Sequence, residues 1–134
     1  MQILFVHPNF PAQFGPVGER LSKREDVQCV FVSRNATGQQ RGFDCVRYNL
    51  RGGATKQNHY CARTFENAVW NSHAVYETCK ATAEISPDLI VGHSGFGSTA
   101  MLAELYGAPI VNFFEYYYRS RGTDMDFRPE YPST

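Results

Sequence analysis

Five short apolar runs recur along the chain, at residues 3–6, 27–32, 43–48, 89–91 and 109–113. Continuous apolar runs of this length are typical of strands that are buried on both faces of a parallel sheet. The third run alternates between apolar and polar residues, so we expect it to be more exposed. Strands buried on both faces need helices to cover them, and this requirement limits the possible folds.

Helical patterns fill the longer intervals between these runs. Gly15-Pro16 opens a short helix, and apolar residues at helical spacing predict a long amphipathic helix over 60–85. A third helix is expected over 98–106, ending at Gly107. Because strands joined through helices make right-handed crossovers, we predict the α/β class, with a doubly wound, mostly parallel, Rossmann-like sheet in the order 3-2-1-4-5 and flanking helices.

Length and charge limit the number of domains and the kinds of partner. At 134 residues, 43% of them hydrophobic, the chain is the size of one domain with a core. We expect one lobe over residues 1–118 and an irregular tail over 119–134. Thirteen basic side chains balance thirteen acidic ones, so no nucleic-acid partner is expected. The first residues lack a basic leader and a long apolar stretch, which favours a cytoplasmic protein.

Three segments are expected to meet at one edge of this sheet. In a doubly wound sheet, ligands bind beyond the carboxyl ends of the strands, where the strand order reverses. That place lies between the first and fourth runs, so residues 7–15 and 92–97 flank it and residues 114–119 follow the next strand. These loops therefore hold the candidate site.

His93 is the first candidate in these loops. A histidine at the carboxyl end of a strand could hydrogen-bond a sugar hydroxyl or a reacting centre, whereas a structural histidine would satisfy the following turn. Around it, Gly92, Gly95 and Gly97 allow the backbone to approach an anion or a sugar. The alternative for this glycine-rich segment is a plain tight turn.

Two other kinds of site are disfavoured. The turn around Ser94 could be compared with the nucleophile elbow of α/β-hydrolases, but Phe96 occupies the position that needs a small residue, and all four histidines precede Ser94 in the chain. His7, His93 and Glu115 carry groups that bind metals, but no short ligand spacing supports a metal site. We therefore expect no metal and no cofactor.

An aromatic segment follows the last apolar run. Residues 113–119 place five aromatic side chains around Glu115 and end at Arg119. Aromatic faces beside a carboxylate and a guanidinium suit the apolar faces and the hydroxyls of a sugar. The alternative is core packing followed by contact with another domain.

At these residues the chain resembles the amino-terminal domain of family 4 glycosyltransferases, which have the GT-B fold. The resemblance covers residues 3–14 (ILFVHPNFPAQF), 87–97 (PDLIVGHSGFG) and 114–119 (FEYYYR), with 124–132 behind them. It implies retaining transfer from a nucleotide-sugar donor to a sugar acceptor, with this lobe on the acceptor side. It also implies that residues 9–15 face the donor phosphates and that His93 lies near the transferred sugar.

The expected site combines both lines of inference. His93 is the expected catalytic residue, and the expected substrate-binding residues are His7, Asn9, Gln13, Phe14, Gly15, Ser94, Gly95, Gly97, Glu115 and Arg119. The resemblance implies a carboxyl-terminal lobe, outside these 134 residues, that binds most of the donor. We therefore expect a truncated fragment that is inactive alone.

Two alternatives to a transferase lobe stay open. A non-catalytic binding or assembly module would keep the fold and use the aromatic surface at 113–118 for a partner, including a second copy of the chain in a homo-oligomer. A flavodoxin-like cofactor domain would need a tight phosphate loop after the first strand, and Pro8, Phe10 and Pro11 make a poor one.

Overall fold

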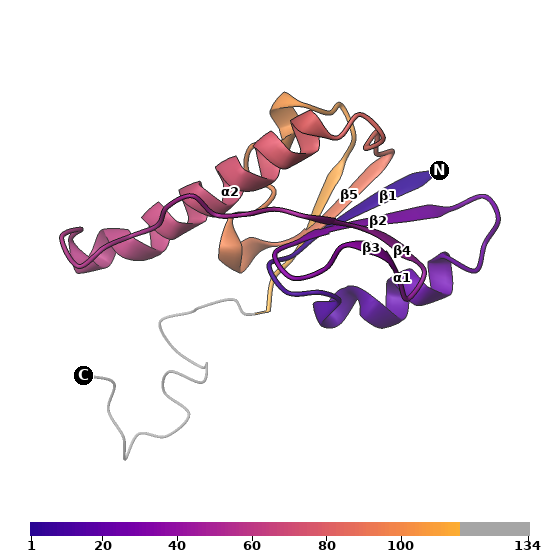
Figure 1. Ribbon diagram of the computed structural model, residues 1–134, viewed down its shortest axis with the longest axis horizontal. Coiled ribbons are helices and arrows are strands. Elements are labelled where there is room, and N and C mark those ends of the chain that lie inside the picture. The colour runs from indigo at the N-terminus through magenta and orange to yellow at the C-terminus, as the bar shows by residue number, and fades with distance from the viewer. Residues whose placement is uncertain (116–134) are drawn as a thin grey trace, which may run out of the picture.

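A single mostly parallel sheet forms the centre of the chain (Figure 1). The computed structural model describes residues 1–115, and there six strands lie in the order β3-β4-β2-β1-β5-β6. Their bounds are Gln2–Val6 (β1), Gln28–Ser33 (β2), Gly38–Gln40 (β3), Phe43–Arg47 (β4), Leu89–His93 (β5) and Ile110–Phe113 (β6). The predicted α/β class, with its mostly parallel sheet and flanking helices, is confirmed.

The edge strand β3 was not predicted. It pairs antiparallel with β4, whereas the other neighbours in the sheet are parallel. Arg41 and Gly42 join the two strands with φ values of 52° and 83°, the backbone of a tight hairpin turn. Because all three residues of β3 are exposed and polar or glycine, no apolar run marked this strand, and the predicted order of five strands omitted it.

The two helices cover opposite faces of the sheet (Figure 1). On one side, Gly15–Leu21 forms α1, preceded by the 3-10 turn η1 at Ala12–Phe14. On the other, Arg63–Ala81 forms α2, preceded by the 3-10 turn η2 at Tyr60–Ala62. Each face has its own apolar cluster, one containing Ile3 and Phe5 and the other containing Leu4 and Val6 of the same strand. The sheet is therefore buried on both faces.

The third predicted helix, over 98–106, is wrong. Turn residues and one 3-10 turn, η4 at Leu102–Glu104, stand there instead, and another 3-10 turn, η3 at Ser94–Phe96, comes before them. Gly97 between them has a left-handed φ of 63°, and a Cβ at this glycine would lie 2.9 Å from the Cβ of Ala68 on α2. A left-handed residue is not part of a right-handed α-helix, so Gly97 interrupts helical backbone at this point. The close contact with Ala68 requires glycine there.

The first half of α2 is less covered than its sequence pattern suggests. The buried residues of this helix are Ser72, Val75 and Cys79, all in its second half. In its first half, Phe65 is 72% exposed although it shares the apolar spacing. Helical periodicity thus predicted the helix but not which half of it packs on the sheet. No helix within residues 1–115 combines the length and the apolar character needed to cross a membrane.

We predict that Gly18→Ala lowers the free energy of unfolding. A Cβ at Gly18 of α1 would overlap the ring of Phe43, which is fully buried in the sheet. Overpacking of this kind costs about 1–3 kcal/mol, whereas alanine returns at most about 1 kcal/mol of helix propensity. Urea denaturation measures the difference.

Gly107→Ala is the matched control, because no atom lies within 4 Å of a Cβ at that position. Its denaturation midpoint should stay near that of the unmodified chain. Equal midpoints for the two variants would contradict the close packing of α1 on β4.

Candidate functional site

The candidate site lies where the order of the strands reverses. β1 and β5 are parallel neighbours, with Val6 opposite Gly92. The chain continues from β1 to β2 on one side and from β5 to β6 on the other. At such a place the two connecting loops diverge and leave room beyond the carboxyl ends of the strands. His7 follows β1 directly and His93 ends β5, so the topology brings the two histidines together.

The two imidazole rings are in contact. Their centroids lie 5.5 Å apart at an interplanar angle of 83°, and both side chains are almost fully buried. The ring of Phe96 lies 5.1 Å from that of His7 and 5.0 Å from that of His93. The histidines therefore form a buried pair under an aromatic ring.

The turn after β5 holds His93 in one tautomer. Its Nδ1 accepts a hydrogen bond of 3.0 Å from the backbone N–H of Gly95, so in the neutral ring the proton is on Nε2. Nε2 is buried and makes no hydrogen bond within residues 1–115. It lies 3.4 Å from Oε1 of Glu115, which is within ion-pair range but lacks hydrogen-bond geometry. The result is an oriented N–H donor that no described residue accepts from.

His7 is held by the loop that follows it. Its Nδ1 lies 3.0 Å from the backbone N–H of Asn9 and 2.9 Å from the carbonyl oxygen of the same residue. Burial lowers the pKa of His7 below its ordinary value of 6.5; the hydrogen bond with Asn9 opposes this shift, nearby His93 adds to it, and Glu115 opposes it weakly. The ring is therefore mainly neutral at pH 7, and its Nδ1 faces both the N–H and the carbonyl oxygen of Asn9, so this loop holds the ring in either tautomer.

The first loop divides into exposed and buried residues. Asn9 and Gln13 are exposed and available to a ligand. Phe14 packs into the core, with its ring 5.8 Å from that of Phe5 and 6.2 Å from that of His7. Gly15 is also buried, with Pro11 only 3.1 Å from the position of a Cβ. Phe14 and Gly15 thus shape the loop, and Asn9 and Gln13 are the residues that could contact a substrate directly.

The glycine-rich turn supports His93 through its backbone. Gly95 is exposed and supplies the N–H that binds the imidazole. Ser94 opens the same turn, and Gly97 closes it in the left-handed conformation against Ala68 of α2. A side chain at Gly97 would be strained and would push α2 away.

Two aromatic residues of the site were missed as candidates. Phe96 lies against both histidines, and Phe113 has its ring 5.8 Å from that of His93. In the sequence, Phe96 served only as evidence against a hydrolase. Its place directly before the glycine that contacts α2 carried no signal, but its position in a loop at the carboxyl edge would have justified including it.

The third segment is described only in part. Glu115 is exposed, with its carboxylate beside His93. Arg119 and the tyrosines at 116–118 lie outside the described residues, so their expected roles stay predictions. Within residues 1–115, no three His, Cys, Asp or Glu side chains are arranged to hold a metal ion.

We predict that His7 titrates below pH 6.5 in the folded chain, because burial lowers its pKa. The unfolded chain then binds the proton more readily, so the contribution of His7 to stability is complete above pH 6.5 and is lost as the pH falls below it. NMR titration of the His7 ring measures this midpoint. A midpoint at or above 6.5 would contradict the burial of the pair.

Comparisons with known proteins bear on the family. The sequence model described as glycosyl transferase family 4 group matches residues 25–134, which include His93 and Glu115 but not His7. No curated protein matches the chain. Among solved structures, the chain is similar to the C-terminal domain of a hydrogenase from Pyrococcus furiosus, at 11% identity over 84% of this chain and 90% of that chain with a TM-score of 0.47. So low a likeness says nothing of function.

The family match covers more than half of the chain and includes two of the three segments that meet at the histidine pair. The resemblance of the sequence to family 4 glycosyltransferases is thereby confirmed, and the chain belongs to the glycosyl transferase family 4 group.

Proposed function

We propose that this chain is the amino-terminal, acceptor-side lobe of a retaining glycosyltransferase that uses a nucleotide-sugar donor. The observation that carries the proposal is the Nε2–H of His93, an oriented donor that makes no hydrogen bond with any residue of the described range 1–115, at the point where the strand order reverses. Membership in the glycosyl transferase family 4 group supports sugar as the ligand.

His93 acts by hydrogen bonding to a hydroxyl of the transferred sugar. The carboxylate of Glu115 stands next to Nε2, and its side chain is 69% exposed. A sugar hydroxyl therefore reaches the Nε2–H group of His93 by displacing the Glu115 carboxylate. The carboxylate then accepts a hydrogen bond from the sugar. Because Gly95 and the pairing of β5 hold the imidazole in place, little reorganisation is needed as charge develops during transfer.

The other site residues position the sugar. Phe96 and Phe113 flank the imidazole with apolar rings, which suit the C–H face of a pyranose. Asn9 and Gln13 are exposed on the first loop, and we assign them to the donor phosphates, with buried Gly15 shaping the loop that carries them. Ser94 and Gly97 shape the turn beneath His93.

Sugar transfer needs a second lobe that binds the nucleotide-sugar donor. Bringing donor and acceptor together accounts for much of the rate enhancement of a two-substrate enzyme. The described residues form one lobe with a single sheet, and we assign the nucleotide of the donor to a second, carboxyl-terminal lobe. A lobe of this kind keeps part of the contacts to sugar but cannot catalyse alone.

A non-catalytic assembly module is the second candidate, and the exposed apolar side chains of the edge strand β6 and of the residue after it favour it. Val111 is 55% exposed, Phe113 is 45% exposed and Phe114 is 70% exposed. Apolar side chains gathered on an edge strand are typical of a surface that contacts a partner. Sedimentation over a range of concentrations separates the two candidates, since an assembly module built from copies of the chain would form a defined oligomer.

We predict that the 134-residue chain transfers no sugar by itself, because the donor is not held beside the acceptor. Release of nucleotide from UDP-glucose and GDP-mannose measures this, and a two-lobed glycosyltransferase in the same assay shows that turnover is detectable. Any enzyme-dependent turnover by the chain would overturn the assignment of the donor to a second lobe.

We predict that His93→Asn lowers turnover in a protein that joins this lobe to its donor-binding lobe. Asparagine can still accept from the N–H of Gly95, as histidine does here, but it cannot place a donor where Nε2 lies. Loss of one preorganised donor should cost roughly 2–4 kcal/mol of transition-state stabilisation. Steady-state kinetics give the value.

His93→Ala and His59→Ala complete the set. His93→Ala also removes the turn contact, so it should lose about 1 kcal/mol of stability in addition to turnover. His59, at the start of η2 and exposed, lies outside the site, so its variant should keep normal turnover. Normal turnover in His93→Asn with a lowered melting temperature in His93→Ala would mean that His93 is only a structural cap.

A further inference from the structure

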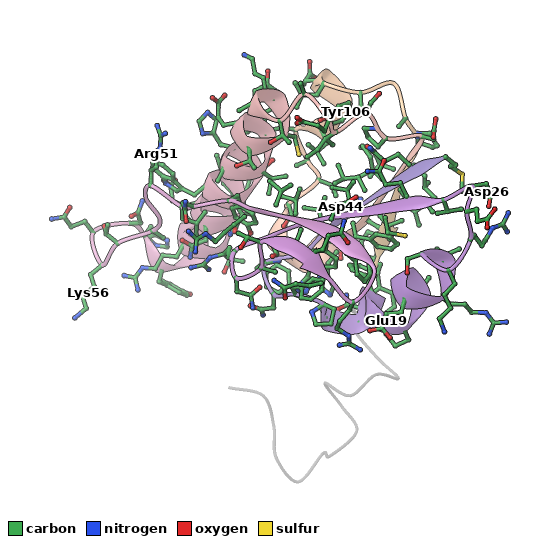
Figure 2. The ribbon with its side chains drawn as sticks, turned by 45° about the vertical axis from the view of Figure 1, so that its right-hand side comes forward. Glu19, Asp26, Asp44, Arg51, Lys56 and Tyr106 are labelled. Atoms are coloured by element: carbon green, nitrogen blue, oxygen red, sulfur yellow. The ribbon has the colours of Figure 1, made fainter. Side chains whose placement is uncertain are left out.

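A pocket opens between the segment after β4 and the exposed side of α2. It has a volume of about 480 Å³ and shares no residue with the histidine pair. Its polar lining comes from Arg47, Asn49, Arg51, Trp70, His73, Glu77 and Thr78. Figure 2 shows Arg51 on the segment beside α2, with Glu19 of α1 on the other side of the sheet. The volume lies within the range of about 300–1,000 Å³ that is usual for small-molecule sites.

Trp70 forms a fixed aromatic wall of this pocket. Its indole N–H donates a hydrogen bond of 3.0 Å to Oε1 of Glu66, one turn earlier on α2. Gly52 lies against the ring so closely that a Cβ there would overlap it. A ring held by both contacts offers a preformed apolar face to a ligand.

Two arginines give the pocket its positive charge. Arg47 is the last residue of β4, and Arg51 follows four residues later. Neither guanidinium has an ion pair or a hydrogen bond with any described residue. Guanidinium groups bind phosphate with several parallel hydrogen bonds, so two unpaired arginines in one concave surface favour an anionic group on the ligand.

The remaining polar residues favour hydroxyl groups beside that anion. Glu77 accepts hydrogen bonds only, and its Oε1 lies 4.0 Å from Nε2 of His73. A carboxylate repels a bare anion but accepts from the hydroxyls of a sugar. Asn49 and Thr78 can both donate and accept. A ligand that carries a phosphate and several hydroxyls uses both parts of this lining.

We propose that this pocket binds a phosphorylated monosaccharide. The phosphate lies between Arg47 and Arg51, the apolar face of the sugar ring stacks on Trp70, and ring hydroxyls donate to Glu77. This site is separate from the histidine pair, and the proposal does not depend on the function assigned to that pair.

Trp70 is the one tryptophan in the chain, so its fluorescence reports directly on the pocket. The full chain is titrated with glucose 6-phosphate, and separately with glucose and with inorganic phosphate. We expect a saturable change with glucose 6-phosphate and at least about tenfold weaker binding of either part alone, because each part leaves half of the lining unused. Added salt should weaken the binding.

Variants locate the binding. Arg47→Ala and Arg51→Ala should each weaken the binding of glucose 6-phosphate about tenfold, since each loses a charged hydrogen-bond partner. Arg20→Ala is the matched control, because Arg20 is exposed on α1, and it should bind normally. Urea denaturation of all three shows that they are folded.

Three results would overturn the proposal. One is the absence of a saturable change in the unmodified chain up to tens of millimolar sugar phosphate, a range that covers even weak specific binding. Another is inorganic phosphate binding as tightly as glucose 6-phosphate, which would reduce the pocket to an anion site. The last is normal binding in both arginine variants, which would place the ligand elsewhere.

Discussion

The burial of β1 on both faces is the constraint on which the rest of the structure depends. Ile3 and Phe5 pack toward α1, and Leu4 and Val6 pack toward α2. Such a strand is stable only in the middle of a sheet with a helical layer on each side. Its pairing with β5 then brings the carboxyl ends of both strands together, so the packing of four apolar side chains determines where His7 and His93 meet.

Much of this arrangement follows from patterns that are local in the sequence. Continuous apolar runs indicated the strands, and the chain order of strands and helices indicated a mostly parallel sheet. The edge strand β3 was not predicted, because its residues are polar or glycine and its pairing depends on the turn at Arg41 and Gly42. The helix expected over 98–106 failed because the contact of Gly97 with Ala68, far apart in the sequence, decides the backbone there. Local propensity cannot report such contacts.

The meeting of the two histidines was predictable from the sequence, but the detail of their contacts was not. Topology rules placed His7 and His93 at one edge of the sheet. The proton on Nε2 of His93, by contrast, depends on the direction of one backbone N–H at Gly95. The contact of Phe96 with both rings depends on how the turn folds. The pocket around Trp70 joins α2 to Arg47 and Arg51, and no spacing in the sequence indicates that these residues meet.

Sugar recognition by His93 is the central claim, and NMR of its ring nitrogens tests it most directly. The measurement compares the ¹⁵N and attached proton signals of the His93 ring in the free chain and at high concentrations of a hexose. The account predicts that the proton is on Nε2, because Nδ1 accepts from Gly95, and that this signal shifts as the sugar replaces the carboxylate of Glu115. A proton on Nδ1, or an Nε2 signal that the sugar leaves unchanged, would contradict it.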